Sequence, residues 1–357
     1  MGRTWLGMGV VIALAAATVA CGSNGGEGQG GSGASTSSGT AGAPGVGGAG
    51  ASGGSTSSGM GGSGAAGGSP PDGPDVDLSD PQLYEFELDP AVLDPSCVDS
   101  LELQYAQLDT RTAPVGRLVI FLTGATNVPA GWRNHGRKLA ELGFHVLIPH
   151  YDNRWSSEGA CDGMPSGCSV DTRWEALTGE DTSSAVDIAR ADSAEGRVVT
   201  MIEHLTTANP EGDWGWFLPQ GELRYGSIVI AGISHGASST GLYAERKTFA
   251  RAVLHSGGPA GDTQAQKLTP IATWYAFAHT DDPAYDAIVG SWSAHGLLGS
   301  VTSIDGASPP YGDAHQLDTA QTSSYPHCST AVHSSSPMAN DGYAFEDAWR
   351  YLYGVAP

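Results

Sequence analysis

Two rhythms of apolar and polar residues alternate along the chain from about residue 100 to its end. Short, continuous apolar runs are typical of buried strands, and the longer stretches between them repeat apolar residues every three or four positions, as amphipathic helices do. Strands are predicted at 100–109, 117–124, 144–151, 227–232, 251–257, 272–279 and 300–305, and helices at 131–143, 194–210, 236–249, 283–296 and 342–354. This alternation predicts one α/β domain with a mostly parallel sheet and helices on both faces.

The N-terminal segment departs from this pattern. Residues 1–20 contain one basic residue, Arg3, followed by an uncharged apolar run that is too short to span a bilayer. We predict that residues 1–20 form a signal peptide. The run ends in "TVAC", which resembles a bacterial lipobox, so Cys21 is expected to be lipidated and to anchor the protein in the cell envelope, with the outer membrane as the expected site. The alternative is an ordinary secretory signal with an incidental cysteine.

A tether is predicted to follow the anchor. Residues 22–70 are rich in glycine and serine and contain a single charge, Glu27. Such a segment cannot bury enough apolar area to offset its chain entropy. The acidic, proline-punctuated stretch at 70–81 then marks the boundary, so we predict a linker at 21–81 and a catalytic domain at 82–357.

Charge and cysteine content narrow the partners and the compartment. The net charge of −22 argues against nucleic acid as a partner, and we expect an exported monomer. Beyond Cys21 there are four cysteines, an even number that suggests two disulfides in an oxidising compartment. Cys161 and Cys168 flank a turn-rich loop and are predicted to pair, which leaves Cys97 with Cys328 by elimination. Their spacings match no zinc site, and no metal is expected.

The pentapeptide "GISHG" at 232–236 is the strongest chemical signal in the domain. The same G-x-S-x-G pattern occurs at 50–54, inside the predicted linker, so the pattern alone is weak. Only the copy at 232–236 follows a predicted buried strand and opens a predicted helix. A nucleophile elbow needs that context, because the sharp turn lifts the serine oxygen above the sheet. Ser234 is therefore the predicted nucleophile.

Candidate partners follow Ser234 in the order acid, then histidine, which this type of triad requires. With this order, residues 100–355 resemble the α/β-hydrolase superfamily. The stretches "FLTGATNVP", "FHVLIPHY", "GISHG", "AHTDDPAY" and "PPYGDAHQL" look like one branch of secreted bacterial serine hydrolases. This resemblance implies an α/β-hydrolase fold and triad chemistry, but no particular substrate.

The acid and the base each have rivals. The "HTDDP" sequence at 279–283 offers Asp282, which precedes Pro283 as in the common turn of this fold, and its neighbour Asp281. Both could instead cap the following helix. His327 is the preferred base, ahead of two other histidines of the same region, His315 and His333.

An oxyanion hole needs two N–H groups aimed at the developing charge. The first is expected from His235, which follows the nucleophile. The second is expected from the "TGAT" loop at 123–126, where Ala125 is preferred and Thr126 is next. The side chain of His235 is assigned no role.

These residues predict a serine hydrolase that cleaves small-molecule or polymeric carboxylic esters through an acyl-enzyme, with no cofactor. The same triad also serves peptidases and acyltransferases. A non-catalytic, surface-tethered binding domain is the remaining alternative, although such a domain has no need of a nucleophile elbow. The long loop at 152–180, with Trp155 and Trp174, is expected to cover the site.

Overall fold

The computed structural model describes residue 21, residues 73–340 and residues 342–355. The predicted signal peptide and most of the predicted linker therefore lie outside the described residues. Within the described part, no helix is long and apolar enough to cross a membrane.

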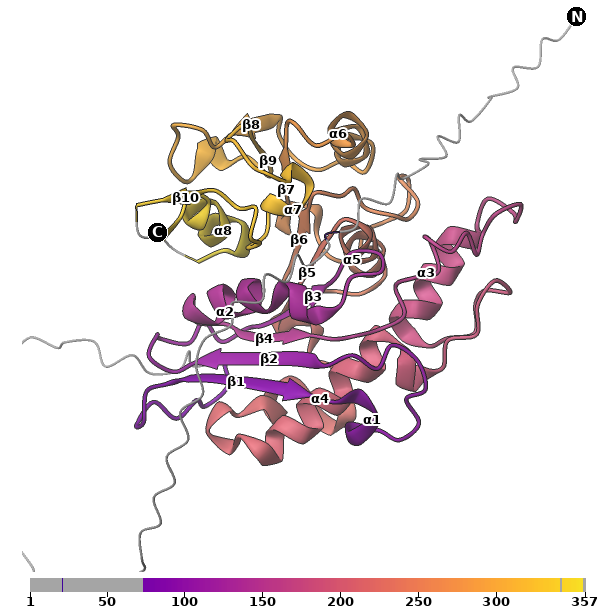
Figure 1. Cartoon of the computed structure of the whole chain (residues 1–357), viewed down its shortest axis with the longest axis vertical. Helices are drawn as coiled ribbons and strands as arrows, with labels where there is room; N and C mark the ends of the chain where they lie inside the picture. Colours follow the sequence, from indigo (N-terminus) through magenta and orange to yellow (C-terminus); the bar gives the residue numbers. More distant parts are fainter. Residues whose placement is uncertain (1–20, 22–72, 341, 356–357) are drawn as a thin grey trace, which may run out of the picture. The chain divides into compact units, whose positions relative to one another are not determined.

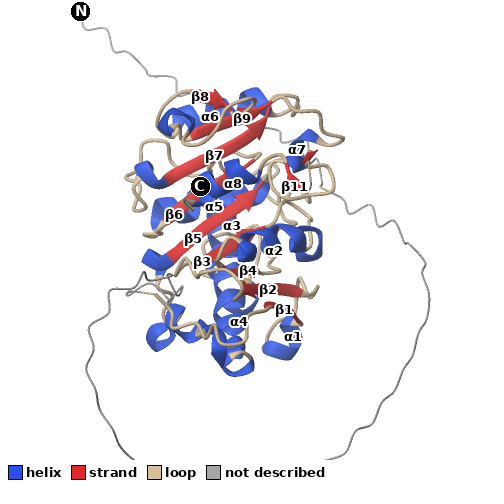
Figure 2. Ribbon diagram, turned by 90° about the vertical axis from the view of Figure 1, so that its left-hand side faces the viewer, coloured by secondary structure: helices blue, strands red, loops and turns tan. Residues whose placement is uncertain are grey.

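A nine-stranded sheet forms the centre of the domain (Figure 1). The strands are ordered β1-β2-β4-β3-β5-β6-β7-β9-β8; β1, β2 and β4 pair antiparallel, and all pairs from β4 to β8 are parallel. Figure 2 shows β1 at one edge of this sheet and β8 at the other. The strands are β1 Leu83–Leu88, β2 Gln104–Asp109, β3 Leu118–Leu122, β4 His145–Ile148, β5 Ile228–Ile233, β6 Arg251–His255, β7 Trp274–His279, β8 Val301–Ser303 and β9 Gln316–Thr319.

Helices lie on both faces of the sheet, as the sequence predicts. They are α1 Pro90–Leu93, α2 Arg133–Glu141, α3 Cys168–Thr178, α4 Ala194–Ala208, α5 His235–Arg246, α6 Tyr285–Ala294, α7 Pro326–Ser329 and α8 Glu346–Tyr353. A small hairpin, β10 Met338–Ala339 with β11 Gly342–Tyr343, precedes α8. Among the elements that the sequence does not predict are β1, β9 and α3, the last of which forms within the expected loop at 152–180.

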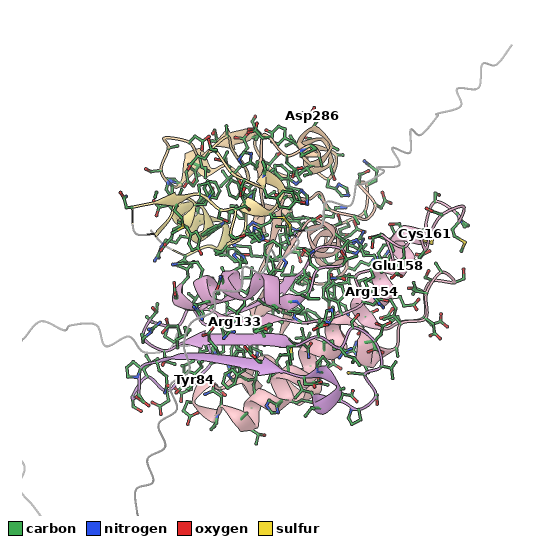
Figure 3. The ribbon with its side chains drawn as sticks, in the orientation of Figure 1. Tyr84, Arg133, Arg154, Glu158, Cys161 and Asp286 are labelled. Carbon is green, nitrogen blue, oxygen red and sulfur yellow. A yellow bond between two sulfur atoms is a disulfide. The ribbon has the colours of Figure 1, made fainter. Side chains whose placement is uncertain are left out.

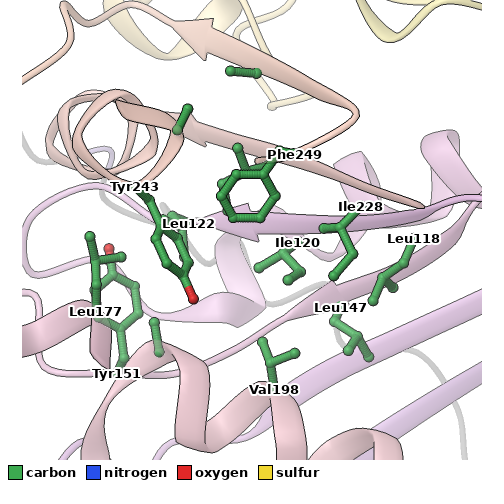
Figure 4. Packing of buried hydrophobic residues seen from close by; sticks show 14 of the residues in the cluster. Leu118, Ile120, Leu122, Leu147, Tyr151, Leu177, Val198, Ile228, Tyr243 and Phe249 are labelled. Carbon is green, nitrogen blue, oxygen red and sulfur yellow. The ribbon is translucent and has the colours of Figure 1, made fainter. Parts of the chain in front are cut away.

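The alternation of side chains along β3 divides the core into two clusters. Leu118, Ile120 and Leu122 face one cluster with side chains from α3, α4, α5 and α6, part of which Figure 4 shows. Val119 and Phe121 face the other cluster with side chains from α2 and α8. Because both faces are covered, the central strands are fully buried, which explains their continuous apolar runs.

The sheet has the order, the mostly parallel pairing and the two helical layers expected of an α/β-hydrolase fold. In such a sheet the carboxyl ends of the parallel strands lie along one side, here called the carboxyl edge. The loops at that edge form the binding site. That edge is where β5, β6 and β7 end, at Ile233, His255 and His279.

The disulfides partly correct the sequence prediction. The Cys161–Cys168 bond is confirmed and lies in the projecting loop in which Figure 3 labels Cys161. The predicted Cys97–Cys328 pair is wrong, because Cys328 bonds to Cys21. Cys97 is a buried free thiol whose Sγ lies 3.3 Å from the carbonyl oxygen of Ala191, just before α4, whereas Cys328 belongs to the cluster on the other face of the sheet.

This pairing also bears on the lipid expected at Cys21. A thioether-linked lipid and a disulfide require the same sulfur atom. In the structure that sulfur is bonded to Cys328, and the lipid at Cys21 stays a prediction.

Candidate active site

Ser234 stands at a strained turn between β5 and α5. Its φ and ψ are 57° and −119°, a conformation that costs a non-glycine residue free energy and that clusters at functional sites. The backbone N–H of Ser234 donates to the carbonyl oxygen of His255, at the end of β6, over 2.9 Å. Ser234 is partly exposed while the residues on either side of it are buried. The turn therefore presents this serine at the carboxyl edge of the sheet.

Glycines make that turn possible by allowing backbone segments to touch. A Cβ atom on Gly236 would lie 2.1 Å from the carbonyl oxygen of Leu122 at the end of β3, and one on Gly232 would lie 2.5 Å from backbone atoms of Gly236. One on Gly257 would lie 2.6 Å from the carbonyl oxygen of Ser234. The glycines of "GISHG" are thus required by close packing around the serine.

The acid and base candidates meet in a buried contact. Asp282, in the loop after β7, accepts a hydrogen bond from Nδ1 of His327 at 2.6 Å, and both side chains are at least nine-tenths buried. The other carboxylate oxygen of Asp282 accepts from the backbone N–H of Ala284 at 2.9 Å. The residue therefore also caps the chain before α6, so the capping role and the partnership with His327 coexist.

Nε2 of His327 is buried and has no hydrogen-bond partner among the described residues, Ser234 included. A base needs this nitrogen free to receive a proton, because Nδ1 is already occupied by the carboxylate. Serine–histidine hydrogen bonds are often long before substrate binds and tighten in the complex.

The rival residues lie elsewhere. Asp281 is exposed, and its backbone N–H contacts the side chain of His279. His315 precedes β9, and its Nδ1 contacts the carbonyl oxygen of Trp274 at the start of β7, at the opposite edge of the sheet from Ser234. His333 contacts Ser335 within its own turn.

The loop after β3 lies against the nucleophile. A Cβ atom on Gly124 would come within 3.5 Å of the Cβ atom of Ser234. Ala125, the predicted oxyanion donor, is partly exposed and follows directly, while Thr126 is exposed with a φ of 60°. The other predicted donor is the N–H of His235, the first residue of α5, which follows the serine directly.

Asn153 holds this loop in shape, although no sequence pattern predicts that role. Its buried Nδ2 lies 2.8 Å from Thr123 Oγ1, 2.9 Å from the Gly124 carbonyl oxygen and 3.0 Å from the Asn127 carbonyl oxygen. A single amide group thus ties together both ends of the candidate oxyanion loop. A lone asparagine in a polar loop carries no pattern that could have identified it.

Residues of the loop at 152–180 pack against the start of α5, directly after Ser234. The buried guanidinium of Arg173, on α3, donates to the carbonyl oxygen of His235 at 3.0 Å and to Ser239 at 2.7 Å. The ring of Trp155 contacts the ring of His235 edge-on, with centroids 4.9 Å apart. Burial, together with the charge of Arg173, holds the pKa of His235 well below its usual value, so this ring is neutral. Trp155 is buried and packs, rather than standing open to solvent.

No cluster of metal-binding side chains occurs in the described part of the chain. The candidate site therefore consists of a strained serine, a buried aspartate–histidine pair and a glycine-containing loop. These are the parts that acyl transfer through an activated serine requires.

No protein-family model and no curated protein matches this sequence. Among solved structures, the chain is similar to a Klebsiella pneumoniae protein described as a candidate dienelactone hydrolase, at 14% identity and a TM-score of 0.35, covering 76% of this chain and 96% of that one. At that identity the likeness does not extend to substrate. The sheet order and the two helical layers of the chain itself are those of an α/β-hydrolase fold.

Proposed function

We propose that this protein is an exported serine hydrolase that cleaves carboxylic esters through Ser234, His327 and Asp282. The observation that carries the proposal is the strained, partly exposed Ser234 at the sheet edge where the buried Asp282–His327 pair also lies. Positive φ at a serine between a buried strand and a helix has a cost, and a nucleophile elbow explains why it is retained.

In the proposed reaction, Nε2 of His327 takes the proton of Ser234 as its Oγ attacks the ester carbonyl. Asp282 accepts from Nδ1, which fixes the ring tautomer with Nε2 unprotonated and stabilises the imidazolium that forms. The short, buried contact supports this role, because charge-assisted hydrogen bonds are stronger when water is excluded.

The tetrahedral intermediate carries a negative oxygen that needs donors. We assign this role to the backbone N–H groups of His235 and Ala125. The position of Gly124 against Ser234 and the anchoring of its loop by Asn153 support the assignment. The imidazolium then protonates the leaving alcohol, and water, activated by the same histidine, releases the acid from the acyl-enzyme.

A fluorophosphonate probe and a series of aryl esters of increasing acyl length test the proposal. The probe should add to Ser234 only, and hydrolysis should disappear in Ser234→Ala. Ser238→Ala, one helical turn further along α5, is the matched control and should retain labelling. An adduct on another serine, or ester hydrolysis that survives Ser234→Ala, would overturn the proposal. Hydrolysis of peptides without hydrolysis of esters would leave the triad standing and replace the substrate class.

Export is part of the proposal. The signal-like pattern at 1–20 supports it, and the Cys161–Cys168 bond fits an oxidising compartment. Anchoring through Cys21 remains a proposal from the lipobox-like sequence alone. In an anchored form the sulfur would carry lipid, and Cys328 would be a free thiol.

A further inference from the structure

Three buried polar side chains from distant parts of the chain meet near the base-bearing loop. They are His135 on α2, His255 at the end of β6 and Tyr353 at the end of α8. Both histidines are fully buried and Tyr353 is 2% exposed. The tyrosine hydroxyl lies 3.1 Å from Nε2 of each histidine. The reaction proposed above uses none of the three.

The outer contacts of this cluster determine the direction of every hydrogen bond in it. Nδ1 of His135 accepts from the backbone N–H of Val332 at 3.1 Å, so a neutral His135 carries its proton on Nε2 and donates to Tyr353. Nδ1 of His255 lies 3.0 Å from the carbonyl oxygen of Thr330, which can only accept, so His255 carries its proton on Nδ1. The hydroxyl of Tyr353 therefore accepts from His135 and donates to His255.

Both rings are held in the neutral form that this pattern needs. Burial lowers the pKa of His255 to about 3, and burial together with His255 lowers that of His135 well below its usual value. The resulting chain has one proton for each contact and leaves no ring nitrogen of the two histidines unpaired.

The ends of the chain connect the two halves of the candidate site. Thr330 and Val332 lie three and five residues after His327. The backbone carbonyl of His255 accepts the N–H of Ser234 at 2.9 Å. Beside it, Ser256 Oγ contacts Thr330 Oγ1 at 2.9 Å. His255 thus contacts the nucleophile through its backbone and the base loop through its side chain.

A purely structural core would not require this arrangement. Buried polar groups are costly unless they are fully hydrogen-bonded, and apolar residues of similar size fill such space at less risk. The loop between β9 and β10 has only the one-turn helix α7 as regular structure, so its backbone needs partners from outside. The cluster supplies a donor and an acceptor at fixed positions.

We propose that His135, Tyr353 and His255 form a positioning chain that fixes the His327 loop relative to Ser234. The proposal rests on the proposed function for its catalytic consequence, but the hydrogen-bond pattern stands independently of it.

The tautomers are the first test and need no activity. In protein labelled with ¹⁵N-histidine, His135 should show its proton on Nε2 and His255 on Nδ1 at neutral pH, with signals assigned by their loss in His135→Gln and His255→Gln. The same tautomer at both residues, or a charged ring at either, would overturn the chain.

Tyr353→Phe is the second test. It removes one hydroxyl and leaves two buried ring nitrogens unpaired. We expect kcat to fall about 10- to 100-fold with KM changed less than about threefold, because the loop that carries the base loses its fixed position while the substrate contacts remain. Fluorophosphonate labelling of Ser234 should slow by a similar factor. Tyr351→Phe, on the same helix, removes a hydroxyl that bonds to the Ala314 carbonyl at 2.8 Å and is the matched control, with kcat expected within about twofold.

Each outcome decides the proposal. A folded Tyr353→Phe with the kcat of Tyr351→Phe would overturn it, as would a loss confined to KM. If Tyr353→Phe does not fold, the wild-type tautomers decide. If wild type neither hydrolyses esters nor reacts with the probe, the proposed function fails, and the tautomers still report on the chain.

Discussion

The nucleophile and the base reach the same edge of the sheet by different physical means. Ser234 belongs to a contiguous strand–turn–helix unit whose shape is set by glycines packed backbone against backbone. His327 lies in a largely irregular loop, in which only the short α7 is regular structure. That loop is held by side chains from α2 and β6, which are far away in the sequence, and from α8, which follows the loop.

The difference explains what each region tolerates. The requirements of the elbow are steric, and two of the three glycines that meet them belong to one pentapeptide, with Gly257 outside it. The base loop is a tertiary structure, so its requirements are hydrogen-bonding partners spread over more than two hundred residues. The elbow should therefore fail when atoms are added, and the base loop should fail when partners are removed.

The largest expected effect distinguishes His327 from His315, one of its two rivals for the role of base. His327→Ala should lower kcat for aryl esters by about 10⁴-fold, as removal of a triad base does elsewhere. His315→Ala should change kcat by less than about threefold, because its ring stacks on Tyr275 at the opposite edge of the sheet. Steady-state kinetics of the two variants make the comparison. A larger loss in His315→Ala would contradict the assignment of the base.

The rivalry between these histidines marks the limit of what the sequence predicts about the site. The apolar runs predicted the central strands within a few residues, and "GISHG" in its context identified the elbow candidate. Strand β9 was not predicted, because "QLDT" is short and three of its four residues are polar. Without β9, the predicted elements place His315 and His327 in one loop after the strand at 300–305. With it, they lie at opposite ends of β9, and only one is on the side of Ser234.

Contacts between side chains of distant elements could not be predicted from the sequence either. Asn153, Arg173 and the His135–Tyr353–His255 chain have no spacing that marks them, since their partners come from other elements. The partner of Cys328 was wrongly predicted by elimination, because that argument assumes that every cysteine except Cys21 forms a disulfide.

The second prediction adds an atom to the elbow. Gly236→Ala places a methyl group 2.1 Å from a backbone oxygen that cannot move without displacing β3. We expect a loss of about 2–4 kcal/mol in the free energy of unfolding, within the range for overpacked or strained sites. Urea denaturation measures it. Gly290→Ala in α6 meets nothing within 4 Å and should be neutral or stabilising by up to about 1 kcal/mol. Equal effects of the two substitutions would remove the steric argument for the elbow.

The third prediction concerns low pH, at which the buried histidines of the base region no longer stay neutral. Below pH 6.5 an unfolded chain protonates His255, whereas the folded chain resists protonation until about pH 3, so the unfolded state gains protons first. Stability is therefore complete above pH 6.5 and falls as the pH is lowered toward 3, by about 1.4 kcal/mol per pH unit for each such histidine. In His255→Asn, the free energy of unfolding from urea denaturation should fall less steeply between pH 6.5 and 4, by about 1.4 kcal/mol per pH unit. An unchanged slope would show that His255 is protonated equally in both states.

The smallest expected effect concerns the cysteines and tests how the base loop is held. Cys97→Ser should change kcat by less than about twofold, because the thiol lies near α4 rather than beside His327. In the wild-type protein, alkylation should find no reactive thiol in the native state, since burial raises the pKa of Cys97, and one thiol per chain after denaturation without reductant. A lipid-bearing Cys21 would instead leave two thiols, Cys97 and Cys328, together with a mass increase on the N-terminal peptide. Three thiols without lipid would mean that the Cys21–Cys328 bond is absent, and that the base loop is held by its hydrogen bonds and packing alone.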